Sequence, residues 1–330
     1  MARRVRTIGG QRGVAERGYI QVTDESEIDC EDGTGVRATR AASRILTPLR
    51  VRAVRDGLTG LGLIALVWAA LFAGADDVRT YWSFAPAHPY GSVVGSANAF
   101  LYSPVAALVA LPFHALPFGV VRLLLMASDV VCLVYLARSW AIALIALPPV
   151  LGDIATGNIH ILLATAIVFG FRYPATWSFP LLTKVTPGVG LLWFAVRREW
   201  RSLAIALAVT GLLVVGSLVL APTWWPAWLH VLASSSGAQV TAPVLTDAPL
   251  PLRLVVAAGI VTWGARTDRA WTVPLAAMIA LPALWVMGSC LLLGALPGLR
   301  LQHRARTAAP VSVPAGARSR EPAGVGRVVG

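Results

Sequence analysis

Long apolar runs, separated by short polar or arginine-rich segments, dominate the middle of this chain. None shows the alternating ten-residue segments that are typical of outer-membrane barrels. Several approach the roughly 20 residues that a helix needs to cross a bilayer. Because lipid leaves backbone polar groups no other partner, these runs predict a helical bundle. The apolar runs are 58–75, 101–116, 118–137, 141–151, 159–171, 177–193, 202–220, 252–264 and 272–299.

The pattern therefore predicts an all-α polytopic membrane protein with about 8–10 transmembrane helices. Run 101–116 is short and is broken by Pro112, so we expect a re-entrant or interfacial helix in the first outside loop. Run 177–193 contains an internal proline and is interpreted as a tight hairpin whose tip reaches outward. Run 272–299 is either one long span or a hairpin around Pro282.

Arginines orient the predicted bundle. Five of them, from Arg40 to Arg55, precede the first run, and others follow later runs. Cytoplasmic loops carry an excess of arginine and lysine, so we place these ends inside and the residues after 75 outside. Segment 222–249 is then an outside loop. Its tryptophan cluster, Trp224, Trp225 and Trp228, is typical of a membrane interface.

Composition supports a membrane protein. The 330 residues are 56% hydrophobic and only 13% charged, whereas soluble domains are about 25% charged. The net charge of +12 follows from the arginines of the loops, so we expect no nucleic-acid partner. We predict three parts: a disordered cytoplasmic tail, 1–56, a transmembrane domain, 57–300, and a disordered tail, 301–330.

The chain carries no recognisable metal or cofactor motif. Its three cysteines lack paired or metal-like spacing, and Cys132 and Cys290 are predicted to be small core residues. The five histidines are scattered. There is no Walker loop, so ATP-driven transport is unsupported. We predict neither a metal nor a cofactor.

The first candidate for chemistry is Asp77, in the stretch ADDVRTYW directly after the first apolar run. A carboxylate at the outer end of a membrane helix can act as a general base. The neighbouring Arg79 and Tyr81 suit a phosphate and a sugar, through charge-assisted bonds and stacking. Alternatively, Asp76 and Asp77 simply end the helix in the headgroup region.

Lys184 is the second candidate, since it is the only lysine in the chain and lies in apolar sequence, LLTKVTPG. Ionisable residues within a membrane usually have a function, and a phosphate-bearing lipid headgroup would be a natural partner. The alternative is a lysine that extends its amine into the headgroup layer.

The segment TGNIHILL supplies a third group. Asn158 and His160 open an apolar run on the predicted outer side, where they either hold sugar hydroxyls or cap the helix. Asp153 lies just upstream and could share the same pocket. Asp129 lies inside a span, where it could pair with Arg122 or with a neighbouring helix.

Four motifs in order resemble the actinobacterial integral-membrane glycosyltransferases of family 87, in the GT-C superfamily. DVRTYW resembles the Asp-x-x-x-Tyr of that family, and FLYSPVAALVALPFHALPFG, which contains Tyr102, resembles its Tyr-Pro-Pro segment and Leu-Pro-Phe turn. GNIHILL resembles Gly-Gln-x-Asn-x-Leu-Leu, and LLTKVTPGVGLLWFAVRREWR resembles its Lys-x-Thr-Pro segment. The resemblance covers roughly residues 71–220.

The resemblance implies a plasma-membrane transferase that uses a polyprenyl-phosphate sugar, usually mannose, and inverts the anomeric carbon. The acceptor would be a lipid or glycan of the cell envelope, on the outer face. Asp77 occupies the position of the catalytic base, Lys184 and Arg79 would bind the donor phosphate, and membrane lipids would surround the protein. Substrate-binding positions would be Tyr81, Tyr102, Asn158, His160 and Trp285.

The chain departs from the family pattern near its end. LPALWVMG keeps Pro282 and Trp285 of a Ser-Pro-x-x-Trp-x-His region but not the histidine, and the chain is shorter than typical members. Two alternatives therefore stay open. One is a transporter or flippase of a lipid-linked sugar, and the other is a non-catalytic relative of the transferases.

Overall fold

The computed structural model describes residues 33–92, 99–235, 245–246 and 248–308. The chain divides into two units, residues 1–51 and 52–330. The described part of the first unit belongs to helix α1 (Gly33–Phe72). The second unit contains the remainder of α1 and all the other helices, and the candidate site lies within it.

The described residues form helices and no strands. The α-helices after α1 are α2 (Asp76–Ser83), α3 (Pro104–Ala110), α4 (Phe118–Ala137), α5 (Ala141–Ile145), α6 (Pro148–Thr156), α7 (His160–Gly170), α8 (Ser178–Thr183), α9 (Leu192–Val196), α10 (Trp200–Leu220), α11 (Trp224–Ser235), α12 (Leu250–Arg266), α13 (Thr272–Ile279) and α14 (Ala295–Ala308). The 3₁₀ helices are η1 (Leu111–Ala115), η2 (Arg138–Trp140), η3 (Pro174–Trp177), η4 (Thr186–Leu191) and η5 (Val286–Gly294).

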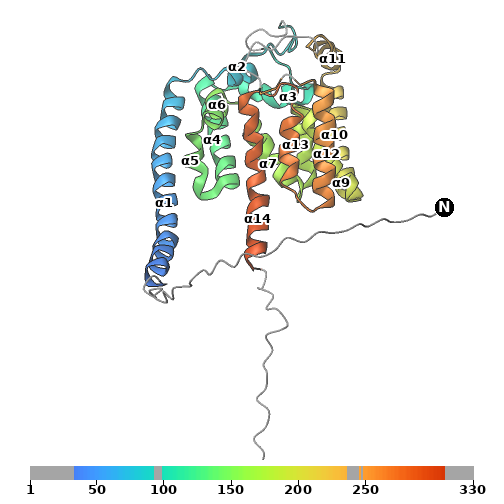
Figure 1. Cartoon of the computed structure of the whole chain (residues 1–330). Coiled ribbons are helices and arrows are strands. Elements are labelled where there is room, and N and C mark those ends of the chain that lie inside the picture. The colour runs from blue at the N-terminus through green and yellow to red at the C-terminus, as the bar shows by residue number, and fades with distance from the viewer. Residues whose placement is uncertain (1–32, 93–98, 236–244, 247, 309–330) are drawn as a thin grey trace, which may run out of the picture. The chain divides into compact units, whose positions relative to one another are not determined.

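Three stretches of the described chain are long and apolar enough to cross a membrane: Leu49–Phe72, Phe118–Ile145 and Trp200–Leu220. A fourth forms if α6 and α7, which meet at a bend of 100°, make one broken span. The other apolar runs form shorter helices. The fold is thus all-α and polytopic, as the apolar runs predict, although the described residues hold three or four such spans rather than the 8–10 expected. Figure 1 shows the long helices running side by side.

Prolines explain why several predicted runs are broken. Pro148 begins α6 and separates it from α5, because proline lacks the N–H that a continuing helix needs. Pro187 lies in η4, after the chain has turned at Lys184 between α8 and η4. Around Pro282 the chain leaves α13 and returns as η5, so the structure has the hairpin rather than the single long span.

Three segments differ from the sequence-based expectation. The predicted outside loop 222–249 contains helix α11, in which two of the tryptophans bond to protein groups: Trp225 Nε1 donates to Ser217 Oγ at 3.1 Å and Trp228 Nε1 to the Leu101 carbonyl at 3.1 Å. In addition, α1 and α14 extend into the predicted tails, to Gly33 and Ala308 respectively. Residues 1–32 and 309–330 lie outside the described residues.

Burial in the helices follows the pattern of a protein in lipid. In α10 only Ala206 and Ser217 are buried, although almost every residue is apolar, and Val219 is 77% exposed. A helix that is apolar all round and faces outward is matched to hydrocarbon rather than to water. The largest fully buried side chains, Trp177 and Phe194, pack edge to face at 6.3 Å between ring centres.

A buried arginine fixes the hairpin around Pro282. Arg253, at the start of α12, donates hydrogen bonds to the carbonyls of Ala248, Ile279, Leu281 and Pro282 at 2.9, 3.3, 2.7 and 2.7 Å. The last three carbonyls end α13 or follow it, where a helix lacks internal donors. Arg253 therefore satisfies these groups and holds α12 to the turn.

Candidate functional site

The turn between α6 and α7 sets the position of the site. Gly157 ends α6 with φ of 74°, and the amides of Gly157 and Asn158 both donate to the Asp153 carbonyl. Glycine adopts this left-handed conformation without strain. A Cβ at Gly157 would also lie 2.2 Å from Val78 Cγ2 of α2. Only glycine therefore lets α2 approach the turn closely.

This close approach joins Asp77 to Asn158. Asn158 Nδ2 donates to Asp77 Oδ2 at 2.9 Å. The Ile159 amide donates to Asn158 Oδ1 at 2.8 Å, so the oxygen of the side-chain amide is already engaged and its NH₂ group points to the carboxylate. The two motifs, 81 residues apart in the sequence, form one contact.

The carboxyl of Asp77 is half-buried, and burial raises its pKa above the ordinary value of 3.8. The nearby hydroxyl of Thr156, the charge of Lys184 and the hydrogen bond from Asn158 counteract that increase. The positive charge of Lys184, from a helix far away in the sequence, favours the ionised form of this carboxyl.

A buried chain of three side chains lies beside this pair. Asp153 is fully buried, and its carboxylate lies 2.7 Å from His160 Nδ1 and accepts from the Ile161 amide at 3.1 Å. Lys184 Nζ lies 3.3 Å from His160 Nε2. A carboxylate only accepts and an ammonium only donates, so a neutral His160 with its proton on Nδ1 satisfies both contacts. His160 therefore connects Asp153 to Lys184.

Lys184 occupies a strained turn. The next residue, Val185, has φ of 48° and ψ of −59°, and the Thr186 amide donates to the Lys184 carbonyl at 2.6 Å. This is a γ-turn, which is rare, and positive φ is especially unfavourable for a β-branched residue. Such strain clusters at functional sites. Here the strained turn directly follows the end of α8, where Lys184 contacts His160.

Two tyrosines lie next to the lysine. The hydroxyls of Tyr81 and Tyr102 are 3.0 Å apart, and Lys184 Nζ lies 6.0 Å from the centre of the Tyr102 ring. Ser103, which replaces a proline of the family motif, donates from its buried hydroxyl to the Leu182 carbonyl. That bond fixes the start of α3 against the end of α8 and so places Tyr102 beside Lys184.

The structure thus brings together six of the eight candidate residues: Asp77, Tyr81, Tyr102, Asn158, His160 and Lys184. Arg79 is exposed, and its guanidinium lies 4.8 Å from the centre of the Phe118 ring. Trp285 is 42% exposed at the start of η5. Neither shows a contact with the six among the described residues.

Asp153, which the sequence suggested could share the pocket of Asn158 and His160, lies in the cluster through its contact with His160. Thr156 was not among the candidates, and its hydroxyl lies close to Asp77. Asp129 behaves differently. It is fully buried in α4, and neither carboxyl oxygen has a partner in the described structure. Arg122 instead donates to the Ala69 carbonyl, so the suggested pairing of Arg122 with Asp129 is wrong.

Replacing Gly157 by alanine should destabilise the protein by about 2 kcal/mol, because a Cβ strains the left-handed turn and meets Val78. It should also reduce activity, since Asn158 and Asp77 lose their alignment. Gly216→Ala in α10, where a Cβ meets nothing within 4 Å, should leave stability unchanged or raise it slightly. Thermal unfolding in detergent measures both. Equal effects of the two substitutions would contradict this role of Gly157.

Two buried aspartates should respond in opposite ways to leucine. Asp153→Leu leaves His160 and the Ile161 amide without their acceptor and should destabilise the protein by about 3 kcal/mol. Asp129→Leu removes an unpaired carboxyl and should be neutral or stabilising by about 1 kcal/mol. Melting temperatures of both variants test this contrast, which fails if Asp129→Leu is the more damaging change.

The helices define an all-α integral membrane protein, with a buried polar cluster among its apolar helices. The model of glycosyltransferase family 87 matches residues 100–310, which is well over half of the chain, and the chain belongs to this family. No curated protein and no solved structure matches.

Family membership makes the protein a glycosyltransferase, with a sugar donor and an acceptor as substrates. The match includes Tyr102, Asn158, His160, Lys184 and Trp285. It begins after Asp77, Arg79 and Tyr81, whose assignment to the site rests on the geometry of α2. Hydrogen bonding of Asp77 to Asn158 connects that helix to the matched region.

Proposed function

We propose that this glycosyltransferase moves a sugar, mannose in the first instance, from a polyprenyl phosphate to an acceptor of the cell envelope on the outer face of the plasma membrane. One observation carries the proposal. Half-buried Asp77 is bonded to Asn158, and the only lysine of the chain, Lys184, contacts His160, two residues after Asn158, so both belong to one polar cluster among apolar helices. A single-displacement transfer from a phospho-sugar needs a base for the acceptor hydroxyl and a cation for the departing phosphate.

In the proposed reaction Asp77 accepts the proton of an acceptor hydroxyl. The hydroxyl oxygen forms a bond to the anomeric carbon while the bond from that carbon to the phosphate oxygen breaks. The electron pair leaves with the polyprenyl phosphate, and the configuration at the carbon is inverted. Asn158 orients Asp77 by its hydrogen bond, and Tyr81 and Tyr102 supply ring faces and hydroxyls to the sugar.

Lys184 would stabilise the charge on the departing phosphate. His160 and Asp153 hold the ammonium group through the contacts at 3.3 and 2.7 Å. Both ring nitrogens of His160 are engaged in those contacts, so His160 positions Lys184 and leaves the sugar to other groups. Arg79 lies on the exposed face of α2, so it would contact the donor phosphate while the lipid enters the site and not during the transfer.

The pH dependence of transfer should follow Asp77. A general base works only when ionised, so kcat/KM should fall as the pH is lowered through the pKa of Asp77, which burial places above its ordinary value. Asn158→Ala removes a hydrogen bond that lowers this pKa, and should move the acid limb to higher pH. Ser83→Ala, at the exposed end of α2, should not move it. An unmoved limb in Asn158→Ala would contradict the assignment.

The proposal is tested by the product. Purified protein is incubated with labelled mannosyl polyprenyl phosphate and envelope lipids, and mass spectrometry detects any new glycosidic linkage and its anomeric configuration. A new inverted linkage supports the proposal. Transport of the label across a proteoliposome without a new linkage supports the transporter alternative, and donor binding without turnover supports a non-catalytic relative. Transfer from a nucleotide sugar instead would replace the proposed donor.

A further inference from the structure

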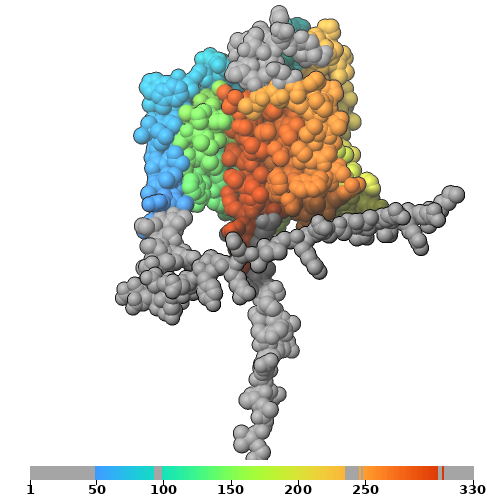
Figure 2. Space-filling model, viewed as in Figure 1, coloured from blue at the N-terminus to red at the C-terminus, as the bar shows by residue number. Residues whose placement is uncertain are grey.

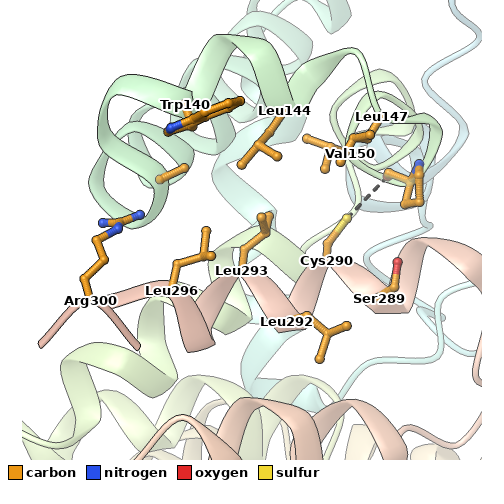
Figure 3. Close-up of a pocket in the computed structure, with 12 residues that line it drawn as sticks. Trp140, Leu144, Leu147, Val150, Ser289, Cys290, Leu292, Leu293, Leu296 and Arg300 are labelled. Atoms are coloured by element: carbon orange, nitrogen blue, oxygen red, sulfur yellow. Dashed lines mark hydrogen bonds between the residues drawn. The ribbon is translucent and has the colours of Figure 1, made fainter. Parts of the chain in front are cut away.

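A groove outside the candidate active site lies between α5–α6 and the helix formed by η5 and α14. Its volume is about 560 Å³, within the range of ligand pockets. In Figure 3, Trp140, Leu144 and Val150 line one wall and Leu293 and Leu296 the other. Figure 2 shows the face on which the surface of residues 118–156 adjoins that of η5 and α14.

One end of this groove is cationic and the remainder is almost wholly apolar. Arg300 is the only charged residue among the twelve that line the groove. Its guanidinium donates to the Leu136 carbonyl at 2.6 Å, near the end of α4, and the indole of Trp140 lies nearby (Figure 3). At the other end lie Pro149 and Ser289, and the Cys290 thiol donates to the Pro149 carbonyl at 3.3 Å.

The dimensions of the groove match one leaflet of a bilayer. Between Ser289 and Arg300 the chain rises about 19 Å, as part 3₁₀ and part α-helix. The hydrocarbon core of one leaflet is about 15 Å thick, half of the whole core. A fully extended acyl chain can therefore lie along the groove with its headgroup at Arg300.

The cationic end is remote from the candidate active site. α4 begins at Phe118, whose ring contacts Trp82 and Arg79 of α2. It reaches Leu136 about 27 Å later along its axis. Arg300 therefore lies about one membrane thickness from Asp77, on the arginine-rich side that the sequence places in the cytoplasm. A donor whose phosphate lies at Lys184 cannot also place it at Arg300.

We propose that this groove binds an anionic phospholipid of the cytoplasmic leaflet, with one acyl chain between the two walls and the headgroup phosphate at Arg300. Charge complementarity selects the lipid, since an arginine beside an apolar trough fits a molecule with a negative head and a long tail. Trp140 also indicates that this end of the groove lies at the headgroup boundary of the bilayer, because tryptophan is enriched there. The bound lipid would join α5 to α14.

Lipid binding to the purified full-length protein tests the proposal. Native mass spectrometry counts bound phosphatidylglycerol, with phosphatidylcholine of the same acyl chains as the comparison. Wild type should retain phosphatidylglycerol and prefer it to phosphatidylcholine. R300Q should weaken that binding about fivefold, in line with one basic residue at a membrane surface. R300K keeps the charge and should bind nearly as well as wild type, as should R266Q, which removes an exposed arginine elsewhere.

A second variant keeps the arginine and fills the groove. Leu296→Trp should displace the acyl chain and weaken phosphatidylglycerol binding to a similar extent, which tests the proposal even if R300Q fails to fold. Equal affinity for the two lipids in wild type would overturn the proposal. So would undiminished binding in both R300Q and Leu296→Trp, or an equal loss in R266Q. Competition by a polyprenyl phosphate for the same site would assign the groove to the donor instead.

Discussion

Asp77→Asn should fold as the wild type does and lose sugar transfer, with kcat lower by about 10³-fold, the size of effect expected when a general base is removed. The substitution keeps the shape of the side chain and its capacity to bond with Asn158, but an amide cannot accept the acceptor's proton. Steady-state transfer from a polyprenyl-phosphate sugar measures the effect. The donor KM should change little, because the base contacts the acceptor.

Asp76→Asn is the matched control. Asp76 is the preceding residue on the same turn of α2, with the same charge, but it is exposed, whereas Asp77 is half-buried. If the two aspartates merely lay at a helix terminus in the headgroup layer, the two variants would behave alike. A transfer rate near wild type in Asp77→Asn, or an equal loss in Asp76→Asn, would contradict the assignment of Asp77 as base.

Lys184→Gln should lower kcat/KM for the donor by about 100-fold. This is the cost expected when the lysine is removed from the buried charge pair that it is proposed to form with the donor phosphate. Glutamine can still donate to His160 Nε2, so the turn and the contact at 3.3 Å can persist while the charge is lost. The loss should appear in donor binding as well as in turnover, because the ammonium attracts the phosphate both before and after the bond breaks.

The buried chain behind the lysine supplies a graded comparison. His160→Gln keeps an acceptor for Lys184 but loses the fixed imidazole, so its effect should fall between those of wild type and Lys184→Gln. A lysine that only extends its amine into the headgroup layer would tolerate both changes. Donor affinity and turnover that are unaffected in Lys184→Gln would therefore remove the lysine from the mechanism.

Much of the fold could be predicted because the bilayer constrains it. Continuous apolar runs predict helices, and Pro282 marks one of the interruptions that the structure has. The break at Pro148 was not predicted, since 141–151 was interpreted as one run. Helix α11 was missed, because its tryptophans were interpreted as interface residues. In the structure the indoles of Trp225 and Trp228 bond to Ser217 and Leu101, on another helix or far away in the sequence, while their interpretation as interface residues stays a prediction.

The composition of the site was more predictable than its connections. Asp77, Asn158 and Lys184 could be placed at one end of the bundle by counting spans from the arginines. The role of His160 could not, because its two partners come from α6 and from the turn after α8, and only the 100° bend between α6 and α7 brings them to its two nitrogens. The sequence placed Asp153 beside this pocket, but it did not show that Asp153 bonds to His160 or that both carboxyl oxygens of Asp129 lack partners among the described residues.

Sidedness is central to the account, since Asp77 and Lys184 are proposed to act on a donor presented at the outer face. α2 and α3 lie at one end of the helices in Figure 1, and α9, which precedes Arg197 and Arg198, lies toward the other. A short-chain mannosyl prenyl phosphate that dissolves in water and does not cross membranes can be supplied to sealed vesicles of either orientation.

We expect transfer of mannose to envelope lipids in right-side-out vesicles, none in sealed inverted vesicles, and recovery in the inverted vesicles once detergent opens them. Vesicles that carry Asp77→Asn should be inactive in every arrangement, whereas Asp76→Asn vesicles should match the wild type. Transfer that occurs in sealed inverted vesicles but not in right-side-out ones would place the catalytic cluster on the cytoplasmic side and contradict the account.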